Sequence, residues 1–197
     1  MGRASKAQAS EHREQVVEAA SRLFRERGTV VSVADLMAAV GLTHGGFYKQ
    51  FASKSALLGE ATERAFEDLQ ARLAGFDAAH PGDHDAARAA LVDYYLSPGH
   101  RDDLARGCPA SGLAVDMARQ DVGSPARTPY ATGVADLASW LGDRHGGSAG
   151  AATPPGDDEL ASLCTLVGAL VLARATVGSE ISDRLLAAGR AAVAGTD

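Results

Sequence analysis

Apolar residues recur at the three- and four-residue spacing of amphipathic helices along almost the whole chain, and this periodicity restricts the possible folds most. Alanine, the residue with the highest helix propensity, is the most common residue, and runs of β-branched residues are short. The sequence therefore predicts an all-α protein. We expect helices at residues 10–27, 32–41, 43–51, 53–76, 85–96, 101–106, 110–120, 130–144, 157–177 and 179–194, with a Gly- and Pro-rich loop at 146–156.

The composition is that of an ordinary globular protein, since 46% of the 197 residues are hydrophobic and 22% are charged. No apolar run approaches the roughly 18–20 uncharged residues that span a bilayer, and no apolar stretch follows the N-terminus as in a secretory signal. Two cysteines, Cys108 and Cys164, are too few for a disulfide framework. These features predict a cytoplasmic protein with no membrane partner.

Charge is distributed unevenly along the chain. The formal net charge is −6, which alone argues against a nucleic-acid partner. However, the first 60 residues hold eight basic and six acidic residues, a balance of +2, and the remainder hold 11 and 19, a balance of −8. This change of sign suggests that the N-terminal part contacts a polyanion and that the rest does not.

Two short predicted helices, 32–41 and 43–51, are separated by the turn Gly41-Leu42-Thr43. Ser32 and Asp35 form a variant of the capping box at the start of the first helix. Gly41 permits a left-handed backbone, and we expect Thr43 to cap the second helix. The spacing is typical of a helix-turn-helix.

The second of these helices has a composition that stability alone does not explain. Gly45 and Gly46 lie in its first turn, where each costs roughly 0.5–1 kcal/mol relative to alanine. Glycine there lets the backbone approach another surface, and His44, Tyr48 and Lys49 can donate to phosphates or reach base edges. Taken singly, Tyr48 could be a core aromatic and Lys49 an ordinary solvated charge.

Residues 13–58, which include the run Val-Gly-Leu-Thr-His-Gly-Gly-Phe-Tyr-Lys-Gln-Phe, resemble the DNA-binding domain of the TetR/AcrR family of transcriptional regulators. The resemblance implies a helix-turn-helix domain at residues 1–52 and a helical ligand-binding and dimerisation domain at 53–197, with helix 53–76 linking them. Gln50 stands where the family usually has histidine, and Gly46 stands where it usually has serine or threonine. The DNA-contacting residues that the resemblance implies are Ser32, Thr43, His44, Gly45, Gly46, Tyr48, Lys49 and Lys54.

The resemblance further implies a homodimer, in which the last two helices pair with their copies and place two recognition helices ~34–36 Å apart on a pseudo-palindromic DNA operator. Apolar stripes on these helices agree with an interface, although they could equally belong to the core of one subunit. The predicted interface residues are Leu163, Val167, Leu170, Ile181 and Leu185.

Helices between residues 61 and 144 are expected to enclose a pocket for a small hydrophobic effector. For any single residue of this set, plain core packing is the competing interpretation. The predicted lining residues are Phe66, Phe76, Tyr94, Tyr95, Cys108, Leu113, Met117, Tyr130, Leu137 and Trp140.

Cys108 lies between Gly107 and Pro109, near Arg106 and before a predicted helix, an arrangement that favours a thiolate. It is either a sensor of oxidants or electrophiles or a small buried apolar residue. Cys164, inside an apolar helix, is expected to be a packing residue.

The sequence argues against an enzyme, because it contains neither a metal-ligand cluster nor a Gly-x-Ser-x-Gly motif nor a phosphate-binding glycine loop. No cofactor is expected. We therefore predict a ligand-responsive DNA-binding regulator, a repressor released from its operator by a small hydrophobic or electrophilic effector. The alternatives are a transcriptional activator, a redox or electrophile sensor that acts through Cys108, and an enzyme that modifies small molecules.

Overall fold

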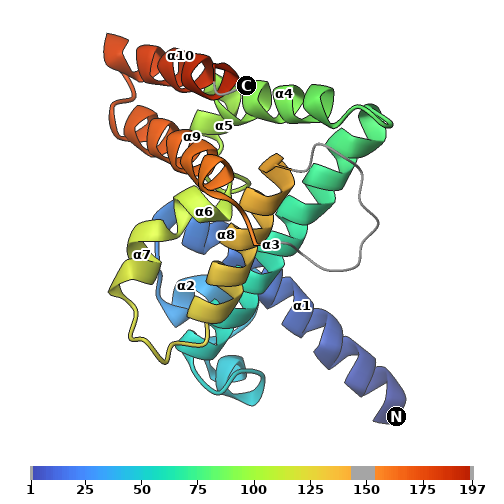
Figure 1. The fold of residues 1–197 in the computed structure, drawn as a ribbon. Coiled ribbons are helices and arrows are strands. Elements are labelled where there is room, and N and C mark those ends of the chain that lie inside the picture. The colour runs from blue at the N-terminus through green and yellow to red at the C-terminus, as the bar shows by residue number, and fades with distance from the viewer. Residues whose placement is uncertain (1, 143–153, 196–197) are drawn as a thin grey trace.

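The structure, a computed structural model, describes residues 2–142 and 154–195, with side chains from residue 7 onward (Figure 1). The described residues form helices and no strand, which confirms the all-α class. Most of the loop predicted at 146–156 lies outside the described residues. The helices are α1 (Gly2–Arg27), α2 (Val33–Ala38), the 3₁₀-helix η1 (His44–Lys49), α3 (Lys54–Ala79), α4 (His84–Tyr95), α5 (Pro98–Asp102), α6 (Pro109–Gly112), α7 (Ala114–Arg119), α8 (Arg127–Gly142), α9 (Asp157–Ala175) and α10 (Glu180–Ala194).

Several helix boundaries differ from the sequence prediction. The first helix does not start at Ser10 but continues back to Gly2, and Ser10 lies inside it. A helix also starts where a break was expected: the Ser97 hydroxyl accepts from the backbone N–H of His100, and Pro98 occupies the first turn of α5. Proline is favourable there because the first N–H groups of a helix have no intrahelical partner.

The predicted helix 110–120 is divided into α6 and α7, which meet at Leu113. Leu113 is 1% exposed, and its backbone (φ −109°, ψ −4°) both ends α6 and begins α7. Burial of this side chain therefore accompanies a change of helix direction that the apolar periodicity did not indicate.

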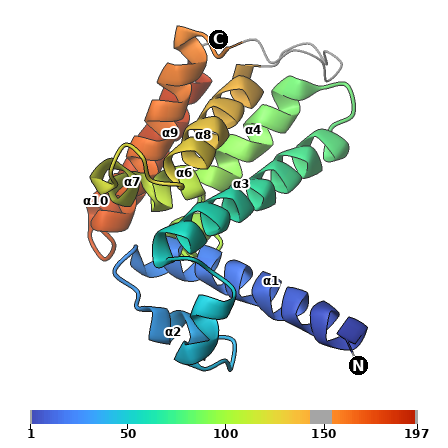
Figure 2. The same cartoon turned by 90° about the horizontal axis from the view of Figure 1, so that it is seen from below.

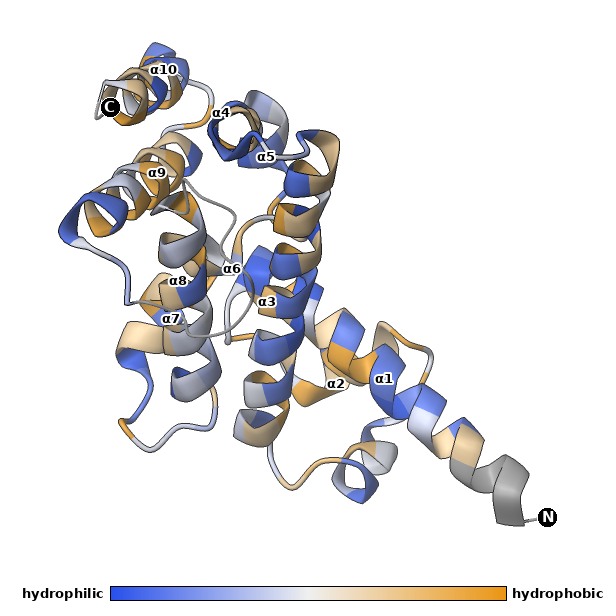
Figure 3. Ribbon diagram, turned by 45° about the vertical axis from the view of Figure 1, so that its right-hand side comes forward, coloured by the Kyte–Doolittle hydropathy of each residue, from blue (hydrophilic) through white to orange (hydrophobic). Residues whose placement is uncertain are grey.

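Two hydrophobic cores organise the molecule. The head core joins α1, α2, η1 and the start of α3, and it includes Phe24, Met37, Phe47 and Leu57. The body core joins the rest of α3 to α4, α8, α9 and α10. Hydropathy colouring shows apolar faces of the body helices turned toward one another (Figure 3). We call the two parts the head and the body.

Helix α3 belongs to both cores. Its first turns place Leu57, Leu58 and Ala61 in the head core, and later turns place Leu69 and Leu73 in the body core. With 26 residues it is about 39 Å long. Figure 2 shows α3 between the head and the layer of body helices. The head core therefore extends past residue 52, and α3 is the continuous element between the two parts.

Two glycines bring α3 and α8 close together. A Cβ at Gly133 of α8 would lie 2.2 Å from the ring of Phe66 on α3. A Cβ at Gly59 of α3 would lie 3.0 Å from the Cβ of Pro125, just before α8. Side chains at these positions would force the two helices apart, so the close packing depends on glycine.

Candidate functional site

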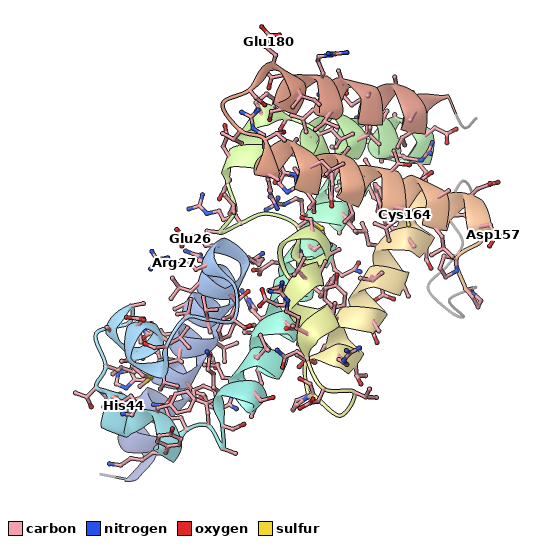
Figure 4. The ribbon with its side chains drawn as sticks, turned by 90° about the vertical axis from the view of Figure 1, so that its left-hand side faces the viewer. Glu26, Arg27, His44, Asp157, Cys164 and Glu180 are labelled. Atoms are coloured by element: carbon pink, nitrogen blue, oxygen red, sulfur yellow. The ribbon has the colours of Figure 1, made fainter. Side chains whose placement is uncertain are left out.

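The exposed face of η1 carries the residues that the sequence indicated for DNA contact. Phe47 is fully buried and packs against Phe51, with ring centroids 5.4 Å apart, which anchors η1 to the head core. Thr43, His44 and Lys49 are exposed, and Tyr48 is 66% exposed. The side chains of Thr43, Tyr48 and Lys49 form no hydrogen bond or ion pair with any residue that the structure describes. In Figure 4, His44 lies at the end of the molecule opposite Glu180.

Glycine at positions 45 and 46 has no packing role inside the chain. A Cβ at Gly45 would meet nothing within 4 Å, and a Cβ at Gly46 would lie 3.6 Å from Met37 Cε, an ordinary contact. Glycine lowers the stability of an α-helix, and η1 is a 3₁₀-helix instead of the α-helix expected at 43–51. Thr43 is the N-cap residue of η1, as predicted, and its carbonyl accepts from the N–H of Gly46 at 2.9 Å, but its side chain forms no capping hydrogen bond.

Ser32 begins α2 at the same end of the head. Its hydroxyl accepts from the backbone N–H of Asp35 at 3.1 Å, while the Asp35 carboxylate accepts from the Ser32 hydroxyl and N–H, a complete capping box. These hydrogen bonds lower the pKa of Asp35. Ser32 is exposed, as expected for a DNA contact, but its hydroxyl is already engaged in the cap.

Lys54, at the start of α3, is half-buried. Its ammonium donates to the backbone carbonyl of Thr29 at 2.5 Å, and two further N–H donors remain. Ser53 caps α3 by accepting from the N–H of Ala56. Lys54 therefore also closes the turn after α1 onto α3, a structural role that the sequence did not indicate.

Polar contacts join the head to the body. The carboxylate of Asp116 on α7 accepts from the backbone N–H of Thr29 at 3.2 Å and from its hydroxyl at 2.5 Å. Arg25 of α1 is 6% exposed and donates to the carbonyl of Gly107 at 3.2 Å. Burial lowers the pKa of Arg25, with the nearby carboxylate of Asp68 opposing this effect. Neither Arg25 nor Asp116 stood out in the sequence, because isolated charges on amphipathic helices are common.

The contacts of Thr29 make a continuous path. Thr29 donates to the carboxylate of Asp116 on α7, and its own carbonyl accepts from the ammonium of Lys54 at the start of α3. A displacement of α7 would therefore act on the turn that positions the start of α3. This path, together with α3 itself, connects the body to the head.

Among the described residues, a small cavity lies in the part of the body where an effector pocket was expected. The cavity measures about 10 Å³, room for roughly one water molecule, and Tyr94, Tyr95 and Cys108 line it. Leu113 and Met117 do not reach it, because they pack in the head core. The other predicted lining residues mainly pack against the body core, as the competing interpretation held: Phe66, Phe76, Leu137, Trp140 and Tyr130, the last of which also touches the head core.

Buried polar groups surround this cavity. His100 accepts from the N–H of Cys108 at Nε2 and contacts the carbonyl of Tyr95 through Nδ1, at 3.0 and 2.7 Å. Burial, reinforced by the neighbouring charge of Arg174, lowers the pKa of His100 to about 4, although the Tyr95 carbonyl acts in the opposite sense. The Tyr95 hydroxyl lies beside the side chains of Cys108 and Ser111 but forms no hydrogen bond of normal geometry, and burial raises its pKa.

The predicted dimer residues divide between the core and the surface. Leu163 and Leu170 are 5% and 0% exposed within one subunit, so they belong to the body core. Val167 and Leu185 are half-buried, and Ile181 is 50% exposed. Cys164, expected to be a packing residue, is exposed on α9 (Figure 4). Further apolar side chains on the outside of α9 and the following turn are Leu160, Leu172 and Val177.

Among the described residues, no helix is long and apolar enough to cross a membrane. The described residues also contain no group of three or more His, Cys, Asp or Glu side chains that could hold a metal ion.

Two short helical elements around a tight turn, joined by one long helix to a helical body, define a helix-turn-helix protein. Residues 16–61 match the family described as bacterial regulatory proteins, tetR family. The chain is thus similar to the TetR family of transcriptional regulators in its helix-turn-helix sequence and in its overall fold.

Solved structures share this fold. A TetR transcriptional regulator from Chloroflexus aurantiacus is 27% identical, with a TM-score of 0.72 over 95% of this chain and 94% of that chain. The reduced form of NemR from E. coli is 19% identical, with a TM-score of 0.70 over 93% of this chain and 95% of that chain. FadR from Bacillus subtilis in complex with stearoyl-CoA is 14% identical, with a TM-score of 0.55 over 93% of this chain and 96% of that chain. The search of curated proteins returned no match.

Proposed function

We propose that this protein is a repressor that binds a double-stranded DNA operator as a homodimer and is released by a small-molecule effector. The observation that carries the proposal is the exposed face of η1. Tyr48 and Lys49 extend from it with no hydrogen bond or ion pair to any described residue, beside two glycines that packing among the described residues does not require. These features are explained if the face meets another surface.

The proposed DNA contacts follow from the positions of these groups. Tyr48, Thr43, Ser32 and Lys54 offer hydroxyl or ammonium donors for phosphate oxygens, which set the register on the duplex. Gly45 lets the η1 backbone approach the DNA. His44, Gly46 and Lys49 are then the positions closest to base edges in the major groove.

The proposed dimer uses the outer surface of α9 and α10. Ile181 and Leu172 are about half exposed, and a surface of this kind is usually covered in soluble proteins. A twofold interface would pair the same patch on both subunits and present two heads to one operator. Leu163 and Leu170 support these helices from inside instead of contacting the partner.

The proposed mechanism is a shift between two head orientations. An effector that binds one body conformation more tightly weakens operator binding by that difference in affinity. The contacts Asp116–Thr29 and Thr29–Lys54, and the Arg25–Gly107 hydrogen bond, would transmit the change. Because the internal cavity is small, a hydrophobic effector in the body must open it or use another site.

The first experiment measures binding of the purified protein to the DNA that flanks its own gene, by fluorescence anisotropy at several salt concentrations. We expect tight, salt-sensitive binding to one fragment and weak binding to a shuffled fragment. Tyr48→Phe should weaken specific binding without changing the melting temperature. Equal binding to both fragments, or no effect of Tyr48→Phe and Lys49→Ala together, would contradict the proposal. A reporter gene under the same fragment separates repression from activation.

A second candidate is an electrophile or oxidant sensor at Cys108. The observation that favours it is that Cys108 lines the internal cavity together with Arg25, Arg72 and Arg106. Its thiol is only 3% exposed, so a reagent must first enter the cavity.

Cys108→Ser and the matched variant Cys164→Ser separate the two cysteines. If Cys108 is the sensor, an electrophile releases wild-type protein and Cys164→Ser from DNA but leaves Cys108→Ser bound. Equal release of all three proteins argues against the sensor.

A further inference from the structure

A groove runs along the seam between α3 and α8, on the side of the body next to the head. Its volume is about 850 Å³, within the range of roughly 300–1,000 Å³ typical of small-molecule sites. Its lining extends from Ala56 to Gln70 of α3, which corresponds to about 21 Å of helix. We call it the α3–α8 groove. It is far larger than the internal cavity and is open without any rearrangement.

The floor of the α3–α8 groove is apolar. Phe66 and Gly59 of α3, with Pro125, Pro129 and Gly133 from the other wall, supply carbon atoms and no charge. The close approach of the helices at Gly59 and Gly133 closes the bottom of the seam. Transfer of the apolar part of a ligand from water to this floor is therefore favourable.

The charged groups of the groove are all acidic. Glu60, Glu63 and Glu67 come from α3 and Asp136 from α8, while no Lys, Arg or His side chain lines the groove. Arg13 of α1 pairs with Glu60 at 2.6 Å from outside the groove. The groove is therefore complementary to positive charge.

Two of these carboxylates are available on opposite walls. Within the described parts of the chain, Glu63 and Asp136 form no ion pair, and both are exposed. Glu67 has only a 3.9 Å contact with Arg64, whose guanidinium also reaches Glu18 at 3.2 Å and Asp68 at 3.1 Å. A cation between Glu63 and Asp136 would interact with both helices at once.

We propose that the α3–α8 groove binds an elongated organic cation, with its positive charge between the carboxylates and its apolar chain on the floor. A bare metal ion does not suit this site, because hard cations prefer six to eight oxygen ligands and the floor offers none. A neutral apolar molecule would leave the carboxylates without a role in recognition. Charge and an apolar body are therefore both required of the ligand.

A ligand bound in the α3–α8 groove would also affect the head, because of where the groove lies. One wall is α3, which continues into the head core, and the other wall begins at Pro125, next to the buried Ala126 of the head core. A ligand that changes the α3–α8 spacing would change the head orientation. This consequence rests on the proposed function, whereas binding in the groove does not.

The test is titration calorimetry on the complete protein without DNA. The probe is decamethonium, which carries two permanent positive charges on a ten-carbon chain, and the comparison compounds are tetramethylammonium and 1,10-decanediol. We expect decamethonium to bind, and each comparison compound to bind at least about tenfold more weakly because it lacks the chain or the charge. Equal affinity for either comparison compound, or no binding of decamethonium, would overturn the proposal.

A pair of double variants locates the site. E63Q/D136N removes the two available groove carboxylates without changing their size, and D121N/D158N removes two exposed carboxylates elsewhere, so that the net charge matches. We expect E63Q/D136N to raise the Kd for decamethonium about tenfold, and D121N/D158N to change it less than about twofold. Circular dichroism shows that both variants are folded. Equal effects of the two variants would overturn the assignment to the groove.

The regulatory link is measured separately, as the effect of decamethonium on operator binding by wild-type protein and E63Q/D136N. If wild-type protein binds decamethonium, E63Q/D136N weakens this binding as expected, and no operator binding is found, the groove assignment stands and the proposed function fails. If operator binding is normal and decamethonium does not bind, the groove assignment alone fails.

Discussion

The head and the body use their polar side chains in opposite ways. On the exposed face of η1, Tyr48 and Lys49 extend into solvent and form no hydrogen bond or ion pair with any residue that the structure describes. In the body, His100 and Arg174 are enclosed and bind backbone carbonyls or N–H groups of neighbouring segments. The polar groups of η1 thus face outward, whereas those around the internal cavity hold segments of the body together.

This contrast explains why a residue pattern predicted the exposed face of η1 better than it predicted a pocket in the body. A contact face needs only exposure and suitable donors, which short-range sequence can indicate. A pocket needs space among side chains, and most aromatic residues predicted to line one fill the core instead.

The largest effect is expected for Phe47→Ala in the head core. Phe47 is fully buried, and truncation of a buried Phe typically costs about 3–5 kcal/mol of unfolding free energy. Because η1 is anchored by this ring, operator binding should be lost even where the protein remains folded. Urea denaturation and anisotropy measure the two effects. Tyr48→Ala, on the exposed side of η1, is the control and should leave stability nearly unchanged.

A pH-dependent effect is expected for His100 in the body. Its pKa is about 4 in the folded protein, below the ordinary value of 6.5, because burial disfavours the charged ring, and the neutral ring accepts from the Cys108 N–H at Nε2. The unfolded chain therefore binds the proton more readily. The contribution to stability is present above pH 6.5 and is lost as pH falls toward 4, by about 3 kcal/mol at most.

Urea denaturation between pH 7.5 and 4.5 measures this loss, and His100→Asn should have a flatter profile over the same range. Wild-type and variant profiles of equal slope would show that protonation of His100 does not govern the acid sensitivity of the body.

An intermediate effect is expected for Gly133→Ala at the α3–α8 contact. The new Cβ would lie 2.2 Å from the Phe66 ring, and overpacking of this kind usually costs about 1–3 kcal/mol. Gly75→Ala on α3 is the matched control. A Cβ at Gly75 meets nothing within 4 Å, so alanine should stabilise the helix by about 0.5–1 kcal/mol. Melting curves that shift in the same direction for both variants would contradict the close packing at Gly133.

The smallest effect is expected for Lys49→Ala on the exposed face of η1. Loss of one phosphate or base-edge cation should weaken operator binding modestly and lower the slope of log K against log salt by about 0.9 if the contact is to phosphate. Arg119→Ala removes an exposed cation from α7 in the body and is the control. An equal change for both variants would indicate a general charge effect instead of a contact by η1.

Much of the head could be predicted from short-range sequence. Gly41 adopts a positive φ of 70°, Ser32 completes its capping box with Asp35, and Phe47 is buried while its neighbour Tyr48 is exposed. Each of these depends on residues no more than a few positions apart. The glycines of η1 are visible in the sequence, but the sequence predicts an α-helix where the structure has a 3₁₀-helix.

The missed residues act across long sequence separations. Asp116 binds Thr29, 87 positions away, and Arg25 binds the carbonyl of Gly107, 82 positions away. The acidic rim of the α3–α8 groove also joins residues of two helices, since Glu63 and Asp136 belong to α3 and α8. A periodic pattern assigns a residue to a face of its own helix but does not identify what that face meets.

The sequence by itself determined the helical class, the helix-turn-helix in the first third and the residues exposed on it, because periodicity, caps and glycines act locally. Only the tertiary structure decided which apolar residues fill the core, which remain on α9 and α10, and where open space is left. The physical reason is that core volume and groove shape depend on how helices distant in sequence pack together. The close α3–α8 contact at Gly59 and Gly133 and the acidic groove above it are formed only when these two helices pack together.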